Sequence, residues 1–401
     1  MKLRLIAAAA VSVVLSGTAA SASDTSVKLG VLVDMSSLYA DTTGKGSVTA
    51  TQMAVEDFGG KVLGRPIEVI AADHQNKPDV GKAIADKWYD SDGVDAIVDV
   101  PTSSVALAVQ NVSREKHRIV LFSGPATSDI TGKFCSPYTV HWTYDTYTLA
   151  HVTGGAMVKA GGDSWFFLTA DYAFGHALER DTAAVVTGSG GKVLGDVPVP
   201  LNNQDFSSFM LQAQASKAKV IGLANAGGDT INSVKSAAEF GITQGGQKLA
   251  GLLLFVTDIH SLTLPVAHGL VMTTAFYWDQ NDKTRAWSKR FYERMHKMPT
   301  MIQAGDYGAV MHYLNAVKAA GTTDADKVMA QMRATPINDF MTENGKIRID
   351  GRVIRRSYLY EVKTPSESKG EWDLLKLVAT VGPDQSIRPL AEGGCALASK
   401  S

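Results

Sequence analysis

Short apolar runs alternate with amphipathic stretches along the first part of the chain. Residues 28–33 (KLGVLV) predict a buried strand, and residues 48–58 predict a helix with its apolar residues on one side. The alternation continues with strands at 66–73, 95–100 and 118–123 and helices at 78–89 and 103–116. Strands separated by helices of about 10–15 residues favour a parallel sheet with right-handed crossovers. This part of the chain therefore predicts one α/β unit.

The alternation starts again near residue 146 and predicts a second α/β unit. Its strands are expected at 164–169, 192–198, 220–224, 249–255 and 270–275. Its helices are expected at 146–159, 174–187, 206–216 and 229–240. Long helices follow at 284–297, 304–320 and 324–333, and antiparallel strands at 346–349, 357–363 and 372–378. We therefore expect two α/β units of similar size, followed by helices and a β-rich end.

The N-terminus has the pattern of a secretory signal peptide. Lys2 and Arg4 precede an apolar stretch at 5–15, which is far shorter than the roughly 20 residues that span a membrane. The small residues up to Ala22 fit a cleavage site, so we expect residues 1–22 to be removed. The alternative is a retained N-terminal anchor. The short, alanine-rich signal is typical of bacteria, and it predicts export to the periplasm.

Composition and charge narrow the class of protein. The chain has 401 residues, 45% of them hydrophobic, and a formal net charge of −1. It is too apolar and too balanced in charge for a disordered protein, and it lacks the basic excess that favours nucleic acid as a partner. Its two cysteines are Cys135 and Cys395, and in an oxidising compartment we expect them to form a disulfide. Two free, buried thiols are the alternative.

Motifs of catalysis and of cofactor binding are absent from the sequence. No G-x-G-x-x-G or G-x-x-x-x-G-K-[ST] loop signals a phosphate cradle, and no G-x-S-x-G elbow signals a nucleophile. The nine histidines form no H-x-x-x-H pair, and acidic residues do not join them at the spacing of a metal site. We therefore expect no enzyme, no cofactor and no metal. A periplasmic hydrolase is the least favoured class of function.

Polar residues gather where three predicted strands of the first unit end. They lie in the segments 34–39, 101–104 and 123–128, which are rich in serine and threonine. Ligands of open α/β sheets bind beyond the carboxyl ends of the strands. Hydroxyls and free backbone N–H groups at a helix start suit an anion such as a carboxylate. One such cluster is more simply a cap or a turn, but three at one sheet edge favour a ligand site.

Several segments, taken in their order along the chain, resemble a known family. They are KLGVLVDMSSLYADTTGKGS, GRPIEVIAADHQNKPDVG, the TSS turn at 102–104, SGPATSDIT, ADYAFG and QDFSSFMLQAQ. The chain is similar to the branched-chain amino-acid (Leu/Ile/Val) binding proteins, which are type I periplasmic solute-binding proteins of ABC importers. The resemblance covers nearly the whole chain after the signal. It depends on the order of the segments, because no single motif is specific.

This resemblance implies the α/β fold of type I periplasmic binding proteins. Two Rossmann-like lobes with parallel sheets would be joined by a three-strand hinge and would close on a small molecule. Lobe one is expected at 27–142 plus 277–346, and lobe two at 145–274 plus 350–380. The chain would then cross between the lobes near 142–145, 274–278 and 344–350. Residues 381–401 would form a C-terminal tail, which the cysteine pair would fasten to the middle of the chain.

The resemblance also implies ligand contacts from lobe one. Ser103 and Ser104 match the serine turn that holds the ligand carboxylate in the family. Ala126 and Thr127 match a turn that offers backbone and hydroxyl contacts. Tyr39 stands in the first loop, where the family has a wall residue. A carboxylate is therefore expected to bind to lobe one before the lobes close.

Further contacts are implied for the opposite wall of the cleft. Tyr172 and Phe174 fall in a loop that would face the cleft from lobe two, and Tyr307 begins a helix that would approach from lobe one. In amino-acid-binding members an acidic residue of lobe two pairs with the ligand ammonium. Asp258 in FVTDIHS is the nearest match, within a residue or two.

Two departures from the amino-acid-binding members affect the expected ligand. Residues 225–229 (NAGGD) stand where those members show an aromatic residue, which leaves more room. Trp142 and Tyr144 stand at the first hinge crossing, where those members have smaller residues. A roomier cleft with aromatic walls favours an aromatic or hydrophobic carboxylate, with a branched-chain or aromatic amino acid as the next choice.

The expected function is solute capture for an ABC importer. Hinge closure would enclose a small, carboxylate-bearing apolar or aromatic solute, and the closed form would dock on an ABC permease in the inner membrane. We expect a monomer. A periplasmic sensor of the same fold, acting with a receptor instead of a permease, is the alternative.

Overall fold

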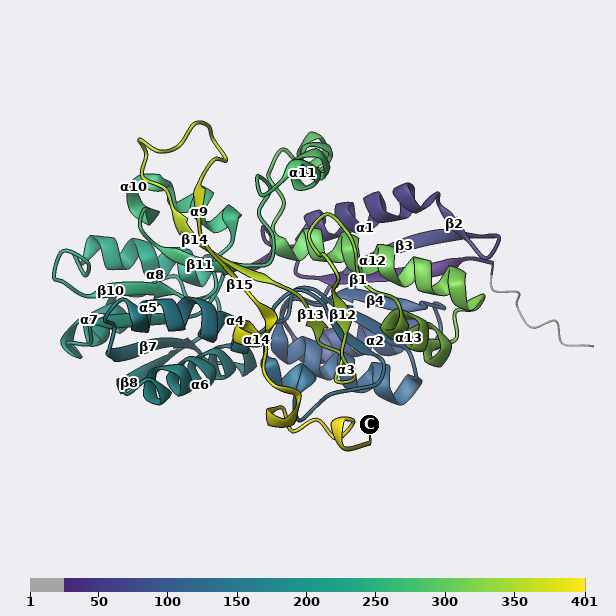
Figure 1. The fold of residues 1–401 in the computed structure, drawn as a ribbon, viewed down its shortest axis with the longest axis horizontal. Helices are drawn as coiled ribbons and strands as arrows, with labels where there is room; N and C mark the ends of the chain where they lie inside the picture. The colour runs from purple at the N-terminus through teal and green to yellow at the C-terminus, as the bar shows by residue number, and fades with distance from the viewer. Residues whose placement is uncertain (1–24, 401) are drawn as a thin grey trace, which may run out of the picture.

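The computed structural model describes residues 25–400, which form two α/β lobes side by side (Figure 1). The predicted signal peptide lies outside these residues. Each lobe is built around a mostly parallel sheet, as the alternation of apolar runs predicted. None of the described helices is long and apolar enough to cross a membrane. The residue bounds predicted for the two lobes stay a prediction.

The sheet of the first lobe has the strand order β2-β3-β1-β4-β5-β6. Only β2 runs antiparallel to its neighbour; the other pairs are parallel. Its strands are β1 (Val27–Val33), β2 (Lys61–Val62), β3 (Arg65–Asp73), β4 (Ala96–Asp99), β5 (Ile119–Phe122) and β6 (Thr139–His141). The carboxyl ends of the parallel strands share one edge, and this edge faces the second lobe.

Both faces of this sheet are covered by helices, as its two-sided apolar strands require. Leu29 and Val31 of β1 point to one face and pack with the core beneath α12 and α13, while Leu32 points to the other face, beneath α2 and α3. Helix α12 also packs along α1, although the two are far apart in sequence. The helices are α1 (Gly44–Phe58), α2 (Pro78–Asp90), α3 (Ser103–Lys116), α12 (Met301–Ala320) and α13 (Ala325–Ala334).

The sheet of the second lobe has the order β10-β9-β7-β8 and is entirely parallel. Its strands are β7 (Ser164–Ala170), β8 (Lys192–Val199), β9 (Val220–Ala224) and β10 (Lys248–Gly251). Trp165 and Phe167 fill the core on one face, and Leu168 fills the core on the other. The helices are α4 (Thr146–Leu149), α5 (Gly155–Lys159), α6 (Ala173–Gly188), α7 (Ser207–Ala215), α8 (Gly228–Glu239), α9 (Val256–Leu262) and α10 (Leu264–Ala267), with a π-helical turn, η2 (Ala150–Gly154), between α4 and α5.

The apolar run at 249–255 differs from its prediction as one strand. Strand β10 ends at Gly251, and helix α9 begins at Val256. The carboxylate of Asp258 accepts a hydrogen bond of 3.0 Å from the backbone N–H of Phe255 and so caps the helix start. Residues 252–255 are nevertheless buried, because Leu253 and Phe255 lie between the lobes and Leu254 packs in the core of lobe two. An apolar pattern cannot distinguish such a buried loop from a buried strand.

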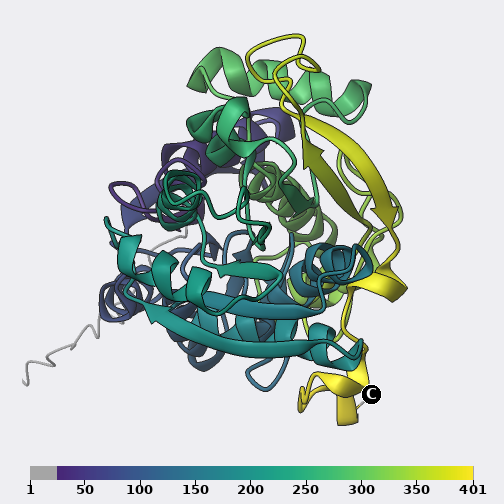
Figure 2. The ribbon, with the colours of Figure 1, turned by 90° about the vertical axis from the view of Figure 1, so that its left-hand side faces the viewer.

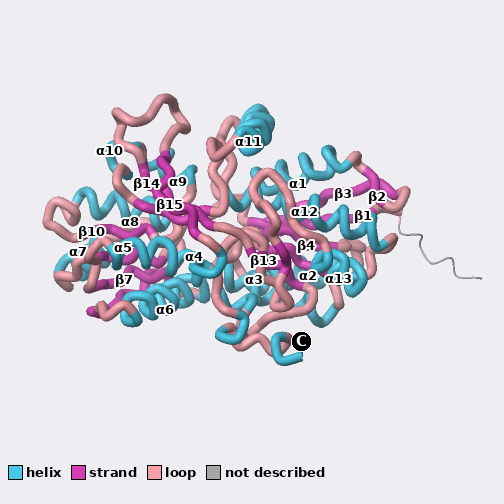
Figure 3. Tube along the Cα trace, viewed as in Figure 1, coloured by secondary structure: helices cyan, strands magenta, loops and turns pink. Residues whose placement is uncertain are grey.

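The chain crosses between the lobes three times. The crossings follow β6, follow β11 (Val271–Thr274) and precede β14 (Ser357–Val362), and the connecting segments lie in the middle of the molecule (Figure 3). Strands β11, β14 and β15 (Leu375–Val381) form an antiparallel sheet. The remaining elements are α11 (Asp282–Met295), which contacts α1, and the short hairpin of β12 (Lys346–Ile347) and β13 (Val353–Ile354), which contacts α13.

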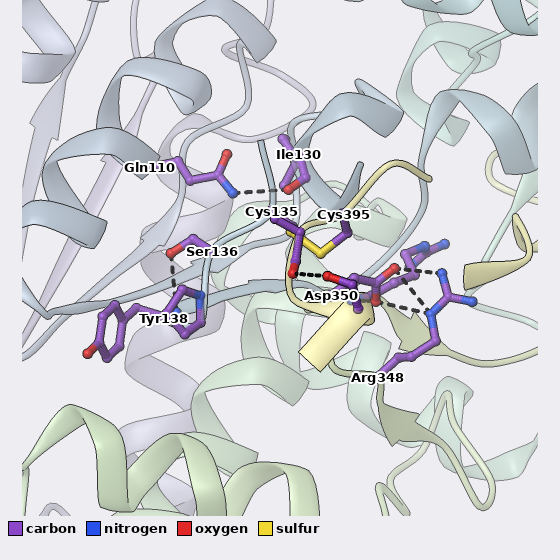
Figure 4. The surroundings of a disulfide bond; sticks show 12 residues. Gln110, Ile130, Cys135, Ser136, Tyr138, Arg348, Asp350 and Cys395 are labelled. Carbon is purple, nitrogen blue, oxygen red and sulfur yellow. Dashed lines mark hydrogen bonds and ion pairs between the residues drawn. A yellow bond between two sulfur atoms is a disulfide. The ribbon is translucent and has the colours of Figure 1, made fainter. Parts of the chain in front are cut away.

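The C-terminal tail returns to the first lobe and is fastened there. After β15 it forms α14 (Pro383–Ser386) and two 3-10 turns, η3 (Leu390–Glu392) and η4 (Ala398–Lys400). Its path along one side of the molecule is clear after a quarter turn (Figure 2). Cys135 and Cys395 form the predicted disulfide, with their Cα atoms 5.6 Å apart (Figure 4). Cys135 lies after η1 (Ser128–Thr131), so the tail is bound to the loop between β5 and β6.

Candidate functional site

A small cavity of about 20 Å³ lies where the two lobes meet. A cavity of this size has room for about one water molecule. Residues from both lobes line it: Tyr39, Thr42, Pro101, Gly124, Ala126, Tyr144, Tyr172, Phe174, Ala226, Leu253, Phe255 and Ile302. None of these lining side chains is an acid or a base. The cavity therefore offers aromatic and aliphatic walls together with a few hydroxyls and backbone groups.

The loop after β1 places Tyr39 in this cavity, and Asp34 shapes the loop. The Asp34 carboxylate accepts hydrogen bonds from the backbone N–H groups of Ser36, Ser37 and Tyr39 and from the amide of Asn76, at 2.7–3.2 Å. Burial alone would raise the pKa of Asp34, but these hydrogen bonds outweigh it and hold the pKa below its ordinary value. Asp34 therefore stays ionised at neutral pH and fixes the position of the Tyr39 backbone.

Tyr39 and Tyr172 meet across the two lobes, and their hydroxyl oxygens are 2.5 Å apart. Tyr39 comes from the loop after β1, and Tyr172 immediately precedes α6. Burial is the main cause that raises the pKa of both phenols above the ordinary value, so both stay protonated at neutral pH. One hydroxyl donates to the other, which leaves the second proton free. The pair thus keeps one O–H donor for a third group.

A second contact between the lobes depends on a glycine. Gly227 precedes α8 with φ +58°, and a Cβ atom there would lie 2.6 Å from the carbonyl oxygen of Leu38. The next residue, Gly228, donates its backbone N–H to that oxygen at 3.4 Å. Only glycine adopts this backbone readily and leaves this space. The start of α8 can therefore lie directly against the first loop of the other lobe.

The serine turn supports the cavity wall from behind. Ser103 is fully buried, and its Oγ accepts the backbone N–H groups of Ala126 (3.3 Å) and Thr127 (3.2 Å). Thr127 is buried as well, and its Oγ1 accepts the N–H of Asp129 at 3.4 Å. Helix α3 begins at Ser103 itself, after Thr102. These bonds fix the turn that carries Ala126.

Aromatic rings form much of the wall. Tyr144 donates its hydroxyl to the carbonyl oxygen of Gly124 at 2.7 Å, which fixes the ring against the sheet edge of lobe one. Its ring meets Phe255 of lobe two edge-on, with ring centres 6.3 Å apart. Phe174 packs beside Tyr172 at 5.8 Å. The wall is therefore made of rings from both lobes, held in place by contacts with one another.

Five of the eleven predicted ligand residues line the cavity together, and six lie elsewhere. The five are Tyr39, Ala126, Tyr144, Tyr172 and Phe174. Ser103 and Thr127 lie behind the wall, and Ser104 is half-buried in the first turn of α3. Trp142 is fully buried in the core of lobe one, where its ring meets His312. Asp258 and Tyr307 lie outside the cavity lining.

Asp258 and Tyr307 do not line the cavity, and each has a partner of its own. Asp258 caps α9 and lines a separate groove at the outer rim of the junction. Burial raises its pKa to about 7, against the hydrogen bond from Phe255. Tyr307 donates its hydroxyl to the carboxylate of Asp57 at 2.8 Å on the outer side of lobe one. A direct ligand contact by these two residues, as by the four others outside the cavity, stays a prediction.

Seven lining residues were missed by sequence reasoning. Three of them, Pro101, Gly124 and Ala226, lie within three residues of a predicted site residue or of the 225–229 segment. The expectation that ligands bind at strand ends therefore indicated the segments to which they belong. Leu253 and Phe255 belong to the apolar run that was predicted as a strand. The other two, Thr42 and Ile302, come from the starts of α1 and α12. Nothing in the apolar pattern distinguishes these residues from ordinary core positions.

Many helices begin at this cavity. Helices α1, α3, α4, α6, α8, α9 and α12 each begin within two residues of a lining residue. The first N–H groups of a helix have no partner within the helix, and they carry a partial positive charge. Asp229 and Asp258 stand in the first turns of α8 and α9 and oppose this effect where they are ionised; burial raises their pKa to about 6 and about 7. The helix starts bring partial positive charge near the cavity, although no basic side chain lines it.

Comparison with known proteins identifies relatives over most of the chain. A family model described as periplasmic binding protein matches residues 26–371. A solved periplasmic binding protein from Burkholderia mallei is 52% identical, with a TM-score of 0.91 over 93% of this chain and 99% of that one. A branched-chain amino acid ABC transporter periplasmic ligand-binding protein from Burkholderia xenovorans LB400 is 42% identical, with a TM-score of 0.83 over 93% and 100% of the two chains. The Leu/Ile/Val-binding protein homolog 6 of Brucella melitensis is 26% identical over 350 residues, which are 84% of this chain and 87% of that protein.

Proposed function

This chain belongs to the periplasmic binding protein family, and from that premise we propose that it captures a small anionic solute with an aromatic or apolar body for an ABC importer. Its relatives are binding proteins of transporters and not enzymes. The chain is accordingly a solute-binding protein of ABC transporters. Our proposal concerns the chemical class of the solute.

The proposed negative charge of the solute rests on one observation. Helix starts surround a cavity that no charged side chain lines. The partial positive charge of the helix starts stabilises an anion there. An amino acid would also bring an ammonium group, and burying that group without an acidic partner is costly. This favours a simple carboxylate over a zwitterion.

The walls support an aromatic or apolar body for the solute. Phe174, Leu253, Phe255 and Ile302 offer apolar surface from both lobes. Aromatic rings prefer offset or edge-on contacts with one another, and such contacts add to the gain from burying apolar area. The enclosed space of about 20 Å³ is small, which favours a single ring or a short chain over a larger solute.

Capture would proceed by hinge closure. The solute carboxylate would bind first to lobe one near the serine turn, where Ser103 and Thr127 hold the backbone and Ser104 offers a half-buried hydroxyl. Tyr172 and Phe174 of lobe two would then cover the solute, and the free O–H of the Tyr39–Tyr172 pair would donate to it. A solute that contacts both lobes binds the closed form more tightly and so shifts the population towards it.

Export to the periplasm, docking on an inner-membrane ABC permease and a monomeric state complete the proposal. A hydrophobic amino acid is the second candidate solute, because the relatives from Burkholderia xenovorans and Brucella melitensis carry names for branched-chain amino acids. Asp258 would then approach the ammonium group. A sensor that presents the closed form to a receptor remains the alternative to transport.

A titration with a panel of solutes tests this proposal. Benzoate, 4-hydroxybenzoate, phenylalanine and leucine are titrated calorimetrically into the purified protein, and the thermal midpoint is followed in parallel. We expect the two aromatic acids to bind and both amino acids to bind far more weakly. Tight binding of leucine without binding of benzoate would contradict the proposal and assign the site to amino acids.

Two substitutions of an alanine by leucine test where the solute binds. Ala226→Leu places a larger side chain in the cavity, and we expect it to abolish binding of the aromatic acids. Ala184→Leu makes the same change at an exposed position on α6 and should leave their affinity unchanged. Equal affinity of both variants would move the solute out of this cavity.

A further inference from the structure

Two carboxyl groups are buried together in lobe one, directly behind the cavity wall. Asp99 ends β4, and Asp306 lies in the second turn of α12; both have 0% exposure. Neither Oδ1 of Asp99 nor either carboxyl oxygen of Asp306 receives a hydrogen bond within the part of the chain that the structure describes. An ionised carboxylate in such a place is costly unless something neutralises it.

The surroundings of the pair are hydroxyls. Ser47 of α1 donates to Oδ2 of Asp99 at 2.7 Å, and the side chains of Ser47 and Ser123 both face Asp306. The hydroxyls of Ser123 and Thr143 are themselves buried without a partner among residues 25–400. A Cβ at Gly305, the residue before Asp306, would lie 2.3 Å from Oγ1 of Thr143 and 3.3 Å from Oγ of Ser123. The cluster is thus compact and rich in oxygen.

No basic side chain among the described residues contributes to the charge around this cluster. The titratable groups that act on it are the two carboxyls themselves and the phenol of Tyr144, whose own pKa is raised by burial and then by Asp99. Burial raises the pKa of Asp99 to about 7, against the hydrogen bond from Ser47 and the influence of the nearby N–H of Gly124. Burial and then the charge of Asp99 raise the pKa of Asp306 well above its ordinary value.

The backbone connects the pair to the cavity. The N–H of Gly124 faces the Asp99 carboxyl, the carbonyl of Gly124 accepts the Tyr144 hydroxyl, and Gly124 itself lines the cavity. A Cβ at Gly124 would lie 2.3 Å from Oδ1 of Asp99. Asp99 and Val100 both adopt positive φ, +77° and +56°, which is a strained conformation for residues other than glycine. The strained backbone conformation at Asp99 and Val100 thus places the Asp99 carboxyl against the cavity wall at Gly124.

We propose that Asp99 and Asp306 form a buried proton-binding site, and that the proton bound there allows the adjoining cavity to accept an anionic solute. With one proton bound the pair carries a single negative charge behind Gly124. Loss of that proton would place a second negative charge beside the solute carboxylate in a dry environment, where repulsion is strong. The second part of the inference depends on the anionic solute proposed above, while the first part does not.

The first experiment tests whether the pair binds a proton in the absence of solute. Thermal midpoints are measured between about pH 5 and pH 9 for the wild type, Asp99→Asn and Asp306→Asn, with the exposed Asp163→Asn as control. The folded pair binds more protons than the unfolded chain, so stability is full below the unfolded pKa and declines as the pH rises through the folded pKa. We expect this decline in the wild type and the control, and a flatter profile in both pair variants.

Parallel profiles in all four proteins would overturn the inference. If neither pair variant folds, infrared difference spectra of the wild type between about pH 6 and pH 8.5 replace them. Loss of a protonated carboxyl band in that range is expected, and its absence would overturn the inference. A midpoint that rises with calcium or sodium chloride, but not with choline chloride at equal ionic strength, would assign the cluster to a cation instead and would also overturn it.

The link to the solute is tested with benzoate. Calorimetric titrations at about pH 7.5 in two buffers of different ionisation enthalpy count the protons that accompany binding. We expect net proton uptake in the wild type, none in Asp306→Asn, and an affinity that falls by up to about tenfold per pH unit above the pKa of the pair. Benzoate binding without proton uptake would contradict this link but leave the proposed function intact. If benzoate does not bind at all, the proposed function fails. The thermal midpoints measured without solute still test whether Asp99 and Asp306 bind a proton.

Discussion

The hydroxyl oxygens of Tyr39 and Tyr172 lie 2.5 Å apart and join the two lobes at the cavity. Tyr172→Phe removes this bond and leaves the shape of the ring unchanged. A hydrogen bond of this kind contributes about 0.5–1.5 kcal/mol. We therefore expect a solute affinity about two- to tenfold lower in calorimetric titration.

Tyr292→Phe is the matched control for this variant. Tyr292 is half-buried on α11, and no hydrogen bond of its hydroxyl occurs within the described chain. It should bind the solute like the wild type. Equal affinity of Tyr172→Phe and the wild type would mean that the tyrosine bond contributes nothing to the closed form.

Gly227→Ala tests whether the close approach of the lobes is needed for binding. The added Cβ would meet the Leu38 carbonyl oxygen at 2.6 Å and the Tyr39 ring at 3.1 Å, so the lobes could not approach as they do here. We expect the affinity to fall on the order of tenfold or more, because the binding-competent form becomes rare. Titration calorimetry measures this change, and small-angle X-ray scattering with solute should report a larger radius than that of the wild type.

Gly241→Ala separates this effect from backbone strain. Gly241 also has a positive φ, +63°, but an added Cβ would have only the flexible Gln244 side chain nearby, at 3.6 Å. Gly241→Ala should lose roughly 1–2 kcal/mol of stability in urea unfolding, because alanine is disfavoured at positive φ. Gly227→Ala should lose at least as much, because its ψ of −133° lies outside the left-handed helical region as well. Only Gly227→Ala should lose affinity; an equal loss in both variants would argue against a steric role.

Local pattern was sufficient to predict β1, β3, β4 and β5 of the first sheet and the four strands of the second sheet, but not the short strands β2 and β6. In β1 the residues Leu29 and Val31 point to one face and Leu32 to the other, and both faces are covered, so the strand is apolar throughout. The same rule failed at 252–255, where Leu253 and Phe255 are apolar because they lie between two lobes. Burial by a distant part of the chain has no local signature, and the pattern there predicted a longer strand.

The candidate site was predictable only in part, for a related reason. Tyr39, Tyr172 and Phe174 lie at strand ends, where a parallel sheet collects its ligand residues. Phe255 and Ile302 reach the cavity only because the two lobes pack together, which no local pattern specifies. Trp142 was predicted at the cavity from its place at the hinge crossing. Its ring instead points into the core of lobe one, where Gly308 leaves room for it.

The disulfide between Cys135 and Cys395 should stabilise the fold through a very long loop. It joins residues that are 260 positions apart and holds the tail against lobe one. Disulfides typically contribute about 2–4 kcal/mol, largely by restricting the unfolded chain. We expect Cys135→Ser/Cys395→Ser to lower the free energy of unfolding in urea by this amount.

Reducing the disulfide of the wild type provides a comparison for the double variant. The wild type in reductant should unfold like the double variant, and the double variant itself should not respond to reductant. The tail keeps other contacts, because the Arg388 guanidinium donates to the carbonyl of Ser128 at 2.7 Å and the backbone carbonyl of Arg388 accepts from the Arg348 side chain at 2.9 Å. Unfolding midpoints that do not differ between oxidised and reduced wild type would show that these contacts alone hold the tail.

The buried pair of Asp145 and Arg352 should make one crossing between the lobes sensitive to acid. Arg352 donates to the Asp145 carboxylate at 2.8 Å, and both are nearly inaccessible. Burial alone would raise the pKa of Asp145, but the charge of Arg352 and the N–H of Thr148 outweigh it and lower the pKa. The folded chain therefore binds this proton less readily than the unfolded chain. The stability that the pair contributes is full above the unfolded pKa of about 3.9 and is lost as the pH falls through the folded pKa.

Asp145→Asn leaves Arg352 as an unpaired buried charge, and breaking such a pair costs about 3–5 kcal/mol. Urea unfolding at about pH 7 should show this loss, and the difference from the wild type should shrink as the pH is lowered below about 4. Glu343→Gln removes a partner from an exposed ion pair with Arg356 (3.6 Å) and should change stability by less than about 1 kcal/mol. If Asp145→Asn is as mild as this control, the pair is not what holds the crossing, and the hydrogen bonds of Arg352 to the backbone carbonyls of His141 and Val353 are the stronger candidates.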